Sequence, residues 1–425
     1  MNNNEPISLS QLAQNITGSE IIKLAADVNE KIKQGHKIYN LTIGDFNPNL
    51  FPIPSELKKQ IIKAYQDNQT NYPPSDGMPD LKKAVSNLLK ERGDLNYKTE
   101  EILITGGARP VIYAIFLTLV DEGDLVVFPV PSWNNNHYSY LTKAKYKMIE
   151  TLPENNFMPS AKDLMPFIST ATLISLCSPL NPTGTTFKKN DLEEICDLIL
   201  EENKKRSLEN KKPLYLLFDQ IYWALTFGQT KHYNPVSLRS EMKNYTVFVD
   251  GISKSLAATG IRLGWSMGPK HIIDKMKSIL THIGAWAPKA EQVAASVFLN
   301  NLEHYDEYLK EIKIKINDRL VSFYNGFLNL KKEGFDVDAI SPEAAIYLTV
   351  QFRLHGKKTN SGRVLNTTAD ITKYLLEEAK VAIVPFYAFG ASDNSNWYRI
   401  SVGNCDLEDV NSIINNLRFA LKNLV

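Results

Sequence analysis

Between residues 100 and 250, short apolar runs alternate with longer helical segments. The runs are "EILIT", "DLVVFPV", "ATLISLC", "PLYLLFD" and "YTVFVDG", and many of their residues are β-branched. Near-continuous apolar strands separated by helices indicate an α/β fold, with a mostly parallel sheet, helices on both faces and right-handed crossovers. Ligands of such sheets bind at the carboxyl ends of the strands, so the polar residues after each run are the first candidates for a site.

The two ends of the chain follow a different pattern. A helical period runs from Ile21 to Lys33 and leads into the strand-like "KIYNLTIGDF". A second helix is predicted to start near Ser55, a candidate N-cap, and a third to end at Gly93. A long helical stretch from Ala290 to Leu328 precedes the segments "AAIYLTVQF", "VAIVPFYAFG" and "WYRIS".

These patterns predict two domains in a chain of 425 residues. Residues 51–310 would form the large sheet domain. Residues 311–425 would form a smaller α+β domain, and the N-terminal segment 1–50 would be part of it.

Composition argues against several classes of function. The formal net charge of +1 favours neither nucleic acid nor an anionic membrane, and the apolar runs are too short to span a bilayer. The start "MNNNEPISLS" lacks the features of a signal peptide. Cys177, Cys196 and Cys405 show neither a disulfide framework nor metal-ligand spacing, so a cytoplasmic protein without a metal is expected. The motifs of serine hydrolases, zinc proteases and P-loop enzymes are also absent.

One lysine and one arginine stand out in the otherwise neutral stretch "DGISKSLAATGIRLGW". A lysine such as Lys254 that enters an apolar site has a lowered pKa, because burial penalises the ammonium form. The neutral amine is a nucleophile that forms a Schiff base with a carbonyl group. Arg262 stays charged and can bind a phosphate with two parallel hydrogen bonds. Together they suggest an aldehyde cofactor that carries a phosphate group.

Polar or aromatic residues follow four other predicted strands, and each has a plain structural reading as well. "TGGAR" offers Gly107 before a helix, where backbone amides bind anions, or only a turn. Trp133 in "PSW" could stack on a planar ring or be a core residue. Asn181 in "NPTG" and the pair Asp219 and Tyr222 in "FDQIY" could be turn or cap residues. Their shared place at strand ends of one sheet favours one common site.

The ordered series of motifs resembles fold-type-I pyridoxal-phosphate enzymes, specifically the class I/II, aspartate-aminotransferase-like aminotransferases. The resemblance covers nearly the whole chain, through "NLTIGDFNP", "NYPPSDGMPDLKKAV", "TGGARPVIYAI", "PVPSWNNN", "SPLNPTG", "FDQIY", "SKSLAATGIRLGW", "PEAAIYL", "VAIVPFYAFG" and "YRIS". It implies a ping-pong aminotransferase that moves the α-amino group of an L-amino acid to a 2-oxo acid. It also implies a homodimer with shared active sites.

The resemblance implies roles for the matched residues. Lys254 would hold pyridoxal 5'-phosphate as an internal aldimine and act as general base, with Asp219 on the pyridinium nitrogen and Tyr222 on the ring oxygen. The other expected cofactor contacts are Trp133 and Asn181 at the ring and Gly107, Ala108, Ser253 and Arg262 at the phosphate, with Tyr72 reaching the neighbouring subunit's phosphate. The expected substrate contacts are Gly44, Trp133, Asn181 and Arg399, the last binding the α-carboxylate.

Three departures from the family pattern accompany the match. Gly251 stands where many relatives have a phosphate-binding serine, Gln220 where glutamate is common, and Phe386 where glycine is usual. An aromatic or large apolar amino donor is expected from Trp133, Trp223, Trp286, Phe386 and Tyr387 and from the lack of arginine in "THIGAWAPKA". The role of Arg109, in the predicted phosphate loop, stays open.

Three alternatives remain open beside the aminotransferase. The first is another reaction of the same fold, such as a C–S β-lyase or an amino-acid decarboxylase, because fold does not fix reaction. The second is a transcription regulator, against which the short segment before "LTIGDF", with no basic recognition helix, argues. The third is a cofactor-free structural relative, against which the full set of polar residues argues.

Overall fold

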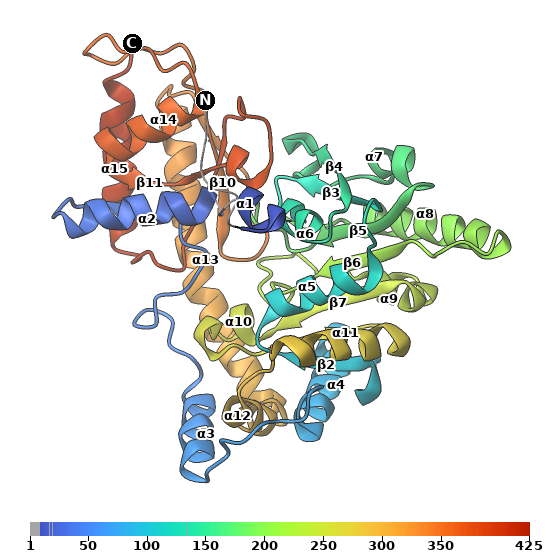
Figure 1. The fold of residues 1–425 in the computed structure, drawn as a ribbon. Helices are drawn as coiled ribbons and strands as arrows, with labels where there is room; N and C mark the ends of the chain where they lie inside the picture. Colours follow the sequence, from blue (N-terminus) through green and yellow to red (C-terminus); the bar gives the residue numbers. More distant parts are fainter. Residues whose placement is uncertain (1–8, 17, 19, 134) are drawn as a thin grey trace.

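The computed structural model describes residues 9–425 except 17, 19 and 134, and Figure 1 shows two halves. In the larger half, helices cover both faces of a twisted sheet. In the smaller half, the blue N-terminal helix α2 lies beside the red C-terminal elements. The long helix α13 (Leu302–Lys332) runs through the smaller half toward the larger one.

The large sheet has seven strands and is mostly parallel, as the sequence predicts. Its spatial order is β2 (Ile102–Thr105), β8 (Gly264–Met267), β7 (Thr246–Gly251), β6 (Tyr215–Asp219), β5 (Ala171–Cys177), β3 (Leu125–Val130) and β4 (Lys145–Glu150). Only β8 runs antiparallel to its neighbours. Two strands were not predicted from the sequence: β8, because it is short, and β4, because it is a largely exposed edge strand that alternates with lysine.

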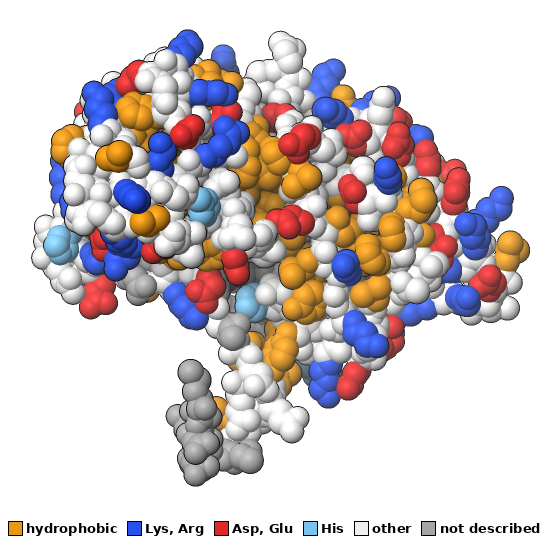
Figure 2. All heavy atoms as spheres, turned by 90° about the horizontal axis from the view of Figure 1, so that it is seen from above, with side chains coloured by type: hydrophobic (Ala, Val, Ile, Leu, Met, Phe, Trp, Pro, Cys, Tyr) orange, Lys and Arg blue, Asp and Glu red, His pale blue; other side chains and the backbone are white. Residues whose placement is uncertain are grey.

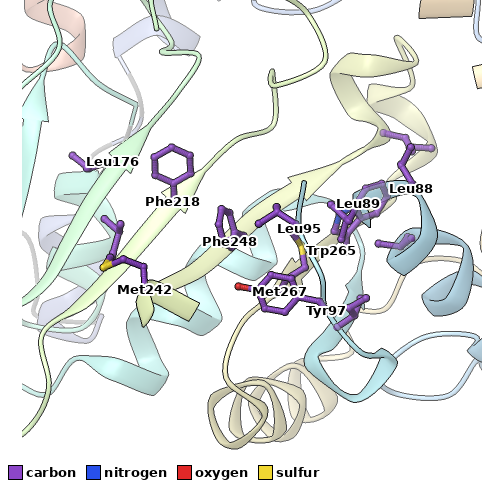
Figure 3. Close-up of a cluster of buried hydrophobic side chains, with 14 of the residues drawn as sticks. Leu88, Leu89, Leu95, Tyr97, Leu176, Phe218, Met242, Phe248, Trp265 and Met267 are labelled. Atoms are coloured by element: carbon purple, nitrogen blue, oxygen red, sulfur yellow. The ribbon is translucent and has the colours of Figure 1, made fainter. Parts of the chain in front are cut away.

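Both faces of the inner strands are buried, which explains why β3, β5, β6 and β7 are largely apolar, unlike the exposed edge strand β4. Successive side chains of a strand point to opposite faces. Phe218 therefore packs against Phe248 on one face, in a buried cluster that extends to Trp265 and Leu88, as Figure 3 shows. Its neighbour Leu217 packs on the other face, against the helices α5 (Ala108–Leu119) and α11 (Lys270–Ile283).

The remaining helices of the larger half surround the sheet. They are α3 (Ser55–Gln66), α4 (Pro79–Gly93), α6 (Asn135–Leu141), α7 (Ala161–Leu164), α8 (Lys189–Leu208), α9 (Pro235–Leu238), α10 (Ile252–Ser255) and α12 (Lys289–Leu299). Short 3-10 turns lie at Thr99–Glu101, Pro153–Asn155, Met165–Phe167, Ser240–Asn244 and Thr259–Ile261.

The smaller half is built on an antiparallel sheet. The order is β12 (Val384–Pro385), β13 (Trp397–Ser401), β10 (Tyr347–Phe352) and β9 (Val337–Ala339). Its helical elements, besides α13, are α1 (Gln11–Asn15), α2 (Glu20–Lys33), α14 (Thr368–Tyr374) with a π turn at Leu375–Ala379, a 3-10 turn at Phe386–Phe389, and α15 (Asp409–Lys422). The strand β1 (Tyr39–Asn40) pairs in parallel with β11 (Val381–Ala382), so the N-terminal segment is part of the smaller half. The domain boundaries themselves stay a prediction.

Three local predictions were wrong for identifiable reasons. The expected helix from Ala290 to Leu328 is two helices, α12 and α13, because the Asn301 side chain accepts the N–H groups of Glu303 and His304 and starts a new helix. Ser55 is the first helical residue of α3, and Pro54 takes the cap position.

The third wrong prediction is the strand "KIYNLTIGDF", which is reduced to Tyr39–Asn40. Beyond it, the backbone oxygens of Thr42 and Gly44 accept hydrogen bonds from charged side chains. In this segment, side-chain donors bond the backbone oxygens in place of a neighbouring strand.

The face of the molecule in Figure 2 carries no large area of one charge. Lys and Arg side chains are intermixed with Asp and Glu, and hydrophobic side chains gather near the seam between the two halves. Within the described ranges, every helix is too short or too polar to cross a bilayer.

Candidate active site

A cavity of about 630 Å³ opens where the parallel strands end and the smaller half begins. It is lined by residues from the ends of β3, β5 and β6 and by the helical turn α10 that follows β7, as expected for a sheet of this kind. The predicted site residues in the lining are Gly44, Ala108, Trp133, Asn181, Asp219, Tyr222, Ser253, Lys254, Arg262 and Arg399. Gly107 and Tyr72 are the predicted residues outside it.

Lys254 is presented to the cavity by α10, the single helical turn that follows β7. Its Nζ donates a hydrogen bond to the backbone oxygen of Gly44 at 2.6 Å. Burial lowers the pKa of Lys254 to about 8; Asp45 opposes this shift, and the charges of Arg399 and Arg109 add to it. A substantial fraction of this amine is therefore neutral near physiological pH, as a nucleophile or base requires.

Asp219 ends β6, the strand beside β7. Its carboxylate accepts the backbone N–H of Ile221 at 3.0 Å, and burial raises the pKa of Asp219 to about 6. Among the described residues it forms no ion pair, although it faces the cavity. A buried carboxylate without a cation is costly, so the site is suited to a ligand that brings positive charge.

Arg399 lies in the middle of β13 and is almost fully buried at 1% exposure. One guanidinium nitrogen donates to Asn181 Oδ1 at 3.0 Å, and another donates to the backbone oxygen of Thr42. The guanidinium carbon lies 4.7 Å from the ring centre of Tyr347. A guanidinium has five N–H groups and these two contacts use two of them, so three remain, including the Nε–H, which has no partner in the structure.

Tyr222 meets a residue to which sequence analysis gave no role. The hydroxyl groups of Tyr222 and Tyr347 lie 2.6 Å apart, and Tyr347 also lines the cavity. A Cβ atom at Gly44 would lie 2.6 Å from the Tyr347 hydroxyl, which explains why a glycine stands there. Tyr347 was inside the matched motif "PEAAIYL", and its place in that motif was the signal available.

A cradle of glycines and Arg262 lies at one end of the cavity. Gly107 precedes α5 with φ 100°, and a Cβ atom there would collide with the Arg262 guanidinium. Arg262 donates to the backbone oxygens of Gly106 at 3.0 Å and Thr259 at 2.8 Å. The N-terminus of α5 and this guanidinium together favour an anion.

The departure at Gly251 has a steric reason. A Cβ atom there would lie 2.8 Å from both Gly264 Cα and Leu263 O, so this backbone leaves no room for the serine of many relatives. Ser253, two residues later, is in the cavity lining and stays a predicted phosphate ligand.

The aromatic residues used to predict the amino donor are mostly elsewhere. Trp133 lines the cavity, with the Arg109 guanidinium 5.4 Å from its ring centre. Trp223, Trp286, Phe386 and Tyr387 are not part of the lining. That reasoning from aromatic density was therefore wrong for those four, although the donor preference itself stays a prediction.

Tyr72 lies outside the cavity of the single chain. Its side chain is 81% exposed, and its ring meets that of Trp286 edge-on at 5.2 Å. Other residues in the lining were not predicted as site residues. Asn135, whose side chain accepts from Ser175 Oγ at 2.9 Å, lies inside the matched motif "PVPSWNNN", and Cys177 directly precedes "SPLNPTG". No motif marks the α2 residues Ile21, Ile22 and Ala25. In the part of the chain that the structure describes, no group of three His, Cys, Asp or Glu side chains could hold a metal ion.

Comparison with known proteins places this geometry in a family. The chain is 32% identical to the probable aspartate/prephenate aminotransferase of Rickettsia conorii over 85% of this chain and 86% of that protein. It is 29% identical to the aspartate aminotransferase of Bacillus subtilis, over 91% and 93% of the two chains. The crystal structure of the aspartate aminotransferase from Rhizobium meliloti matches with a TM-score of 0.89 at 27% identity, covering 98% of this chain and 99% of that one.

These likenesses confirm the predicted fold and the predicted type of enzyme. They favour none of the alternatives that the sequence left open. The family model for aminotransferase class I and II matches residues 36–417, and the chain therefore belongs to this family and is an aminotransferase.

Proposed function

We propose that this aminotransferase binds pyridoxal 5'-phosphate covalently through Lys254 and transfers the amino group of an L-amino acid to a 2-oxo acid in this cavity. Enzymes of the family depend on this cofactor, and their substrates are amino acids and 2-oxo acids. One observation carries the proposal: a buried amine of lowered pKa and a buried carboxylate without a cation share one cavity.

The residues present fit the group. Asp219 offers an unpaired negative charge suited to a protonated ring nitrogen. The N-terminus of α5 with Arg262 offers an anion site for the phosphate. Trp133 offers an aromatic face, and Asn181 and Tyr222 offer polar atoms for the ring. When bound, the cofactor supplies the carbonyl carbon and the electron sink for the chemistry, and the protein supplies orientation and charge.

The chain's own residues would then bind the substrate and move protons. Arg399 would bind the substrate α-carboxylate through guanidinium N–H groups that have no protein partner. The Lys254 amine would take a proton from the α-carbon and return a proton during the exchange. Asn181, already bonded to Arg399, would keep the guanidinium in the plane that a carboxylate needs.

The test is a half-reaction with purified protein supplied with pyridoxal phosphate. Each amino acid of a panel is added in turn, and the visible spectrum, the 2-oxo acid and free ammonia are measured. We expect a cofactor-dependent spectral change with one 2-oxo acid formed per site and no ammonia. Release of ammonia or carbon dioxide as the main product would support the lyase or decarboxylase alternative instead.

The preferred donor has two candidates. The predicted aromatic or apolar donor is supported by Trp133 in the cavity wall. A dicarboxylic donor is supported by Arg109, which lines the cavity and, among the described residues, has no carboxylate partner, and by the printed names of the aspartate-type relatives. Comparing kcat/KM for aspartate and phenylalanine in the parent and in Arg109→Leu separates them, because only a dicarboxylic substrate should lose much in the variant.

We also propose a homodimer in which Tyr72 completes the neighbouring site. The Tyr72 side chain is largely exposed and lies outside the cavity of its own chain, which supports this. Sedimentation should show a dimer, and Tyr72→Phe should weaken cofactor retention. An active monomer would contradict the proposal.

A cytoplasmic location completes the proposed function. Cys177, Cys196 and Cys405 are free thiols, which supports a reducing compartment. Cell fractionation with an antibody against the protein tests it, and recovery with an extracellular fraction would contradict it.

A further inference from the structure

One buried carboxylate beside the site has no role in the chemistry described so far. Asp250 lies on β7 four residues before Lys254 and is fully buried. It is not in the cavity lining. No lysine, arginine or histidine of the described residues forms an ion pair with it. Carboxylates are rarely buried without such a partner, so this one needs a reason.

The Asp250 carboxylate is bonded to two different turns. Oδ1 accepts the backbone N–H of Gly251 at 2.7 Å, on the turn that leads to Lys254. Oδ2 accepts the indole N–H of Trp223 at 3.0 Å, and the Gln220 amide lies at 3.5 Å. Trp223 and Gln220 belong to the turn that carries Asp219 and Tyr222.

These contacts begin where the backbone ladder ends. The last backbone hydrogen bond between the β6 and β7 segments runs from Gln220 N to Val249 O at 3.0 Å. After it, the segment that follows β6 turns toward Tyr222, and the segment that follows β7 enters α10 with Lys254. The contact between Trp223 and Asp250 therefore continues the pairing of β6 and β7 by side chains, at the point where the site residues begin.

Burying the Asp250 carboxyl group removes it from water, which costs free energy when the group is charged. Burial raises the pKa of Asp250 to about 8, against the hydrogen bonds from Gly251, Gln220 and Trp223. The titratable groups that face it are Asp219 on β6, whose charge raises this pKa further, and Tyr305 on α13. Neither neighbour compensates a negative charge, so Asp250 is mainly the neutral acid at neutral pH, and its oxygens still accept the two N–H groups.

We propose that Asp250 is a positioning residue of the aminotransferase reaction: its contact with Trp223 fixes the turn of Asp219 and Tyr222 relative to the turn of Lys254. This rests on the proposed roles of Asp219 and Lys254. Loosening the contact between Asp250 and Trp223 would then change the distance between the Asp219 carboxylate and the Lys254 amine. Turnover should then suffer more than substrate affinity.

The test is a double-mutant cycle with Trp223→Phe, which removes the donor and keeps an aromatic ring, and Asp250→Asn, which keeps the shape and removes one acceptor. We expect each single variant to lower kcat about tenfold with KM nearly unchanged. The double variant should be no slower than the slower single variant. The pH midpoint of the visible absorbance of the bound cofactor should move in both.

Two further readouts keep the test decisive. In cofactor-free protein, the fluorescence that Trp223→Phe removes should change in Asp250→Asn, since the indole loses its acceptor. This signal does not depend on the proposed function, so a wild-type protein without transaminase activity would overturn that function alone. Additive losses, with an unchanged absorbance midpoint and only a lower melting temperature, would show that Asp250 is structural and overturn the proposal. Should Asp250→Asn not fold, the kcat-to-KM split of Trp223→Phe decides.

Discussion

The two walls of the cavity are built in different ways. The sheet wall carries Asp219 and Lys254 at the ends of neighbouring strands whose pairing fixes them. The opposite wall brings together Thr42, Tyr347 and Arg399, which are far apart in the sequence. These are held by the β10–β13 pairing, where Thr349 faces Arg399, and by side-chain contacts.

The difference predicts which kinetic constant a substitution in each wall should change most. A change in the sheet wall removes a reacting or charging group while the substrate contacts remain, so turnover should fall most. A change in the opposite wall alters the group that binds the substrate, so KM and kcat should change together.

The largest effect tests the sheet wall. Lys254→Ala should lower kcat about 100- to 10,000-fold, because no base then remains to take the proton from the substrate α-carbon. The cofactor should still bind, through Asp219 and the anion cradle. Steady-state kinetics and cofactor content check this, with Lys270→Ala as control, since Lys270 is exposed and paired with Asp274. Turnover within tenfold of the parent would contradict the assignment.

A second effect on the same wall is a pH dependence. The pKa of Lys254, about 8, lies below its ordinary 10.5, because burial disfavours the charged amine. In cofactor-free protein, labelling of Lys254 by a small acylating reagent should rise through pH 8 and level off above pH 9. Lys270, whose pKa is raised by its hydrogen bond to Asp274, should still be gaining reactivity at pH 10. Parallel profiles for the two lysines in peptide mass spectrometry would argue against a perturbed amine.

The opposite wall is tested by Arg399→Lys. Lysine keeps the charge but not the planar pair of donors, so kcat/KM should fall about 10- to 100-fold for amino acids and 2-oxo acids alike. KM should rise and kcat fall together, with the cofactor spectrum and melting temperature nearly unchanged. Arg418→Lys, on the surface beside Glu333, is the matched control. Near-normal kinetics would mean that the carboxylate binds elsewhere, with Arg109 the next residue to change.

The smallest effect lies where the two walls touch. Tyr347→Phe removes the hydroxyl that lies 2.6 Å from that of Tyr222 and should lower kcat/KM about fivefold. The loss should disappear in a Tyr222→Phe background, because the partner is then already missing. A full and independent loss in both backgrounds would show that Tyr347 acts on the substrate directly.

The same contrast explains what could be predicted from the sequence. Asp219 and Lys254 follow apolar strands, so local pattern and strand-end geometry suffice to place them together. The same strand-end pattern placed Asn181, whereas Arg399 was placed by the family resemblance. In the structure a guanidinium nitrogen of Arg399 donates to Asn181 Oδ1 at 3.0 Å.

Contacts between distant segments were not predictable in this way. Tyr347 meets Tyr222 across 125 residues of sequence, and nothing local to either tyrosine encodes that distance. Trp223 was expected near the substrate, yet its indole points to Asp250, because only the three-dimensional pairing of β6 and β7 shows which side of the turn it occupies. Helix ends were missed for the opposite reason: the cap at Asn301 is a local signal outweighed by the apolar period around it.

The central claim is that Lys254 is the residue that holds the cofactor. The direct measurement is borohydride reduction of the protein with bound pyridoxal phosphate, followed by digestion and mass spectrometry of the labelled peptide. We predict one label per chain, on Lys254, and loss of the visible absorbance on reduction. The peptide that contains position 254 should carry no label in Lys254→Ala. Recovery of the label on another lysine, in an active protein, would contradict the account.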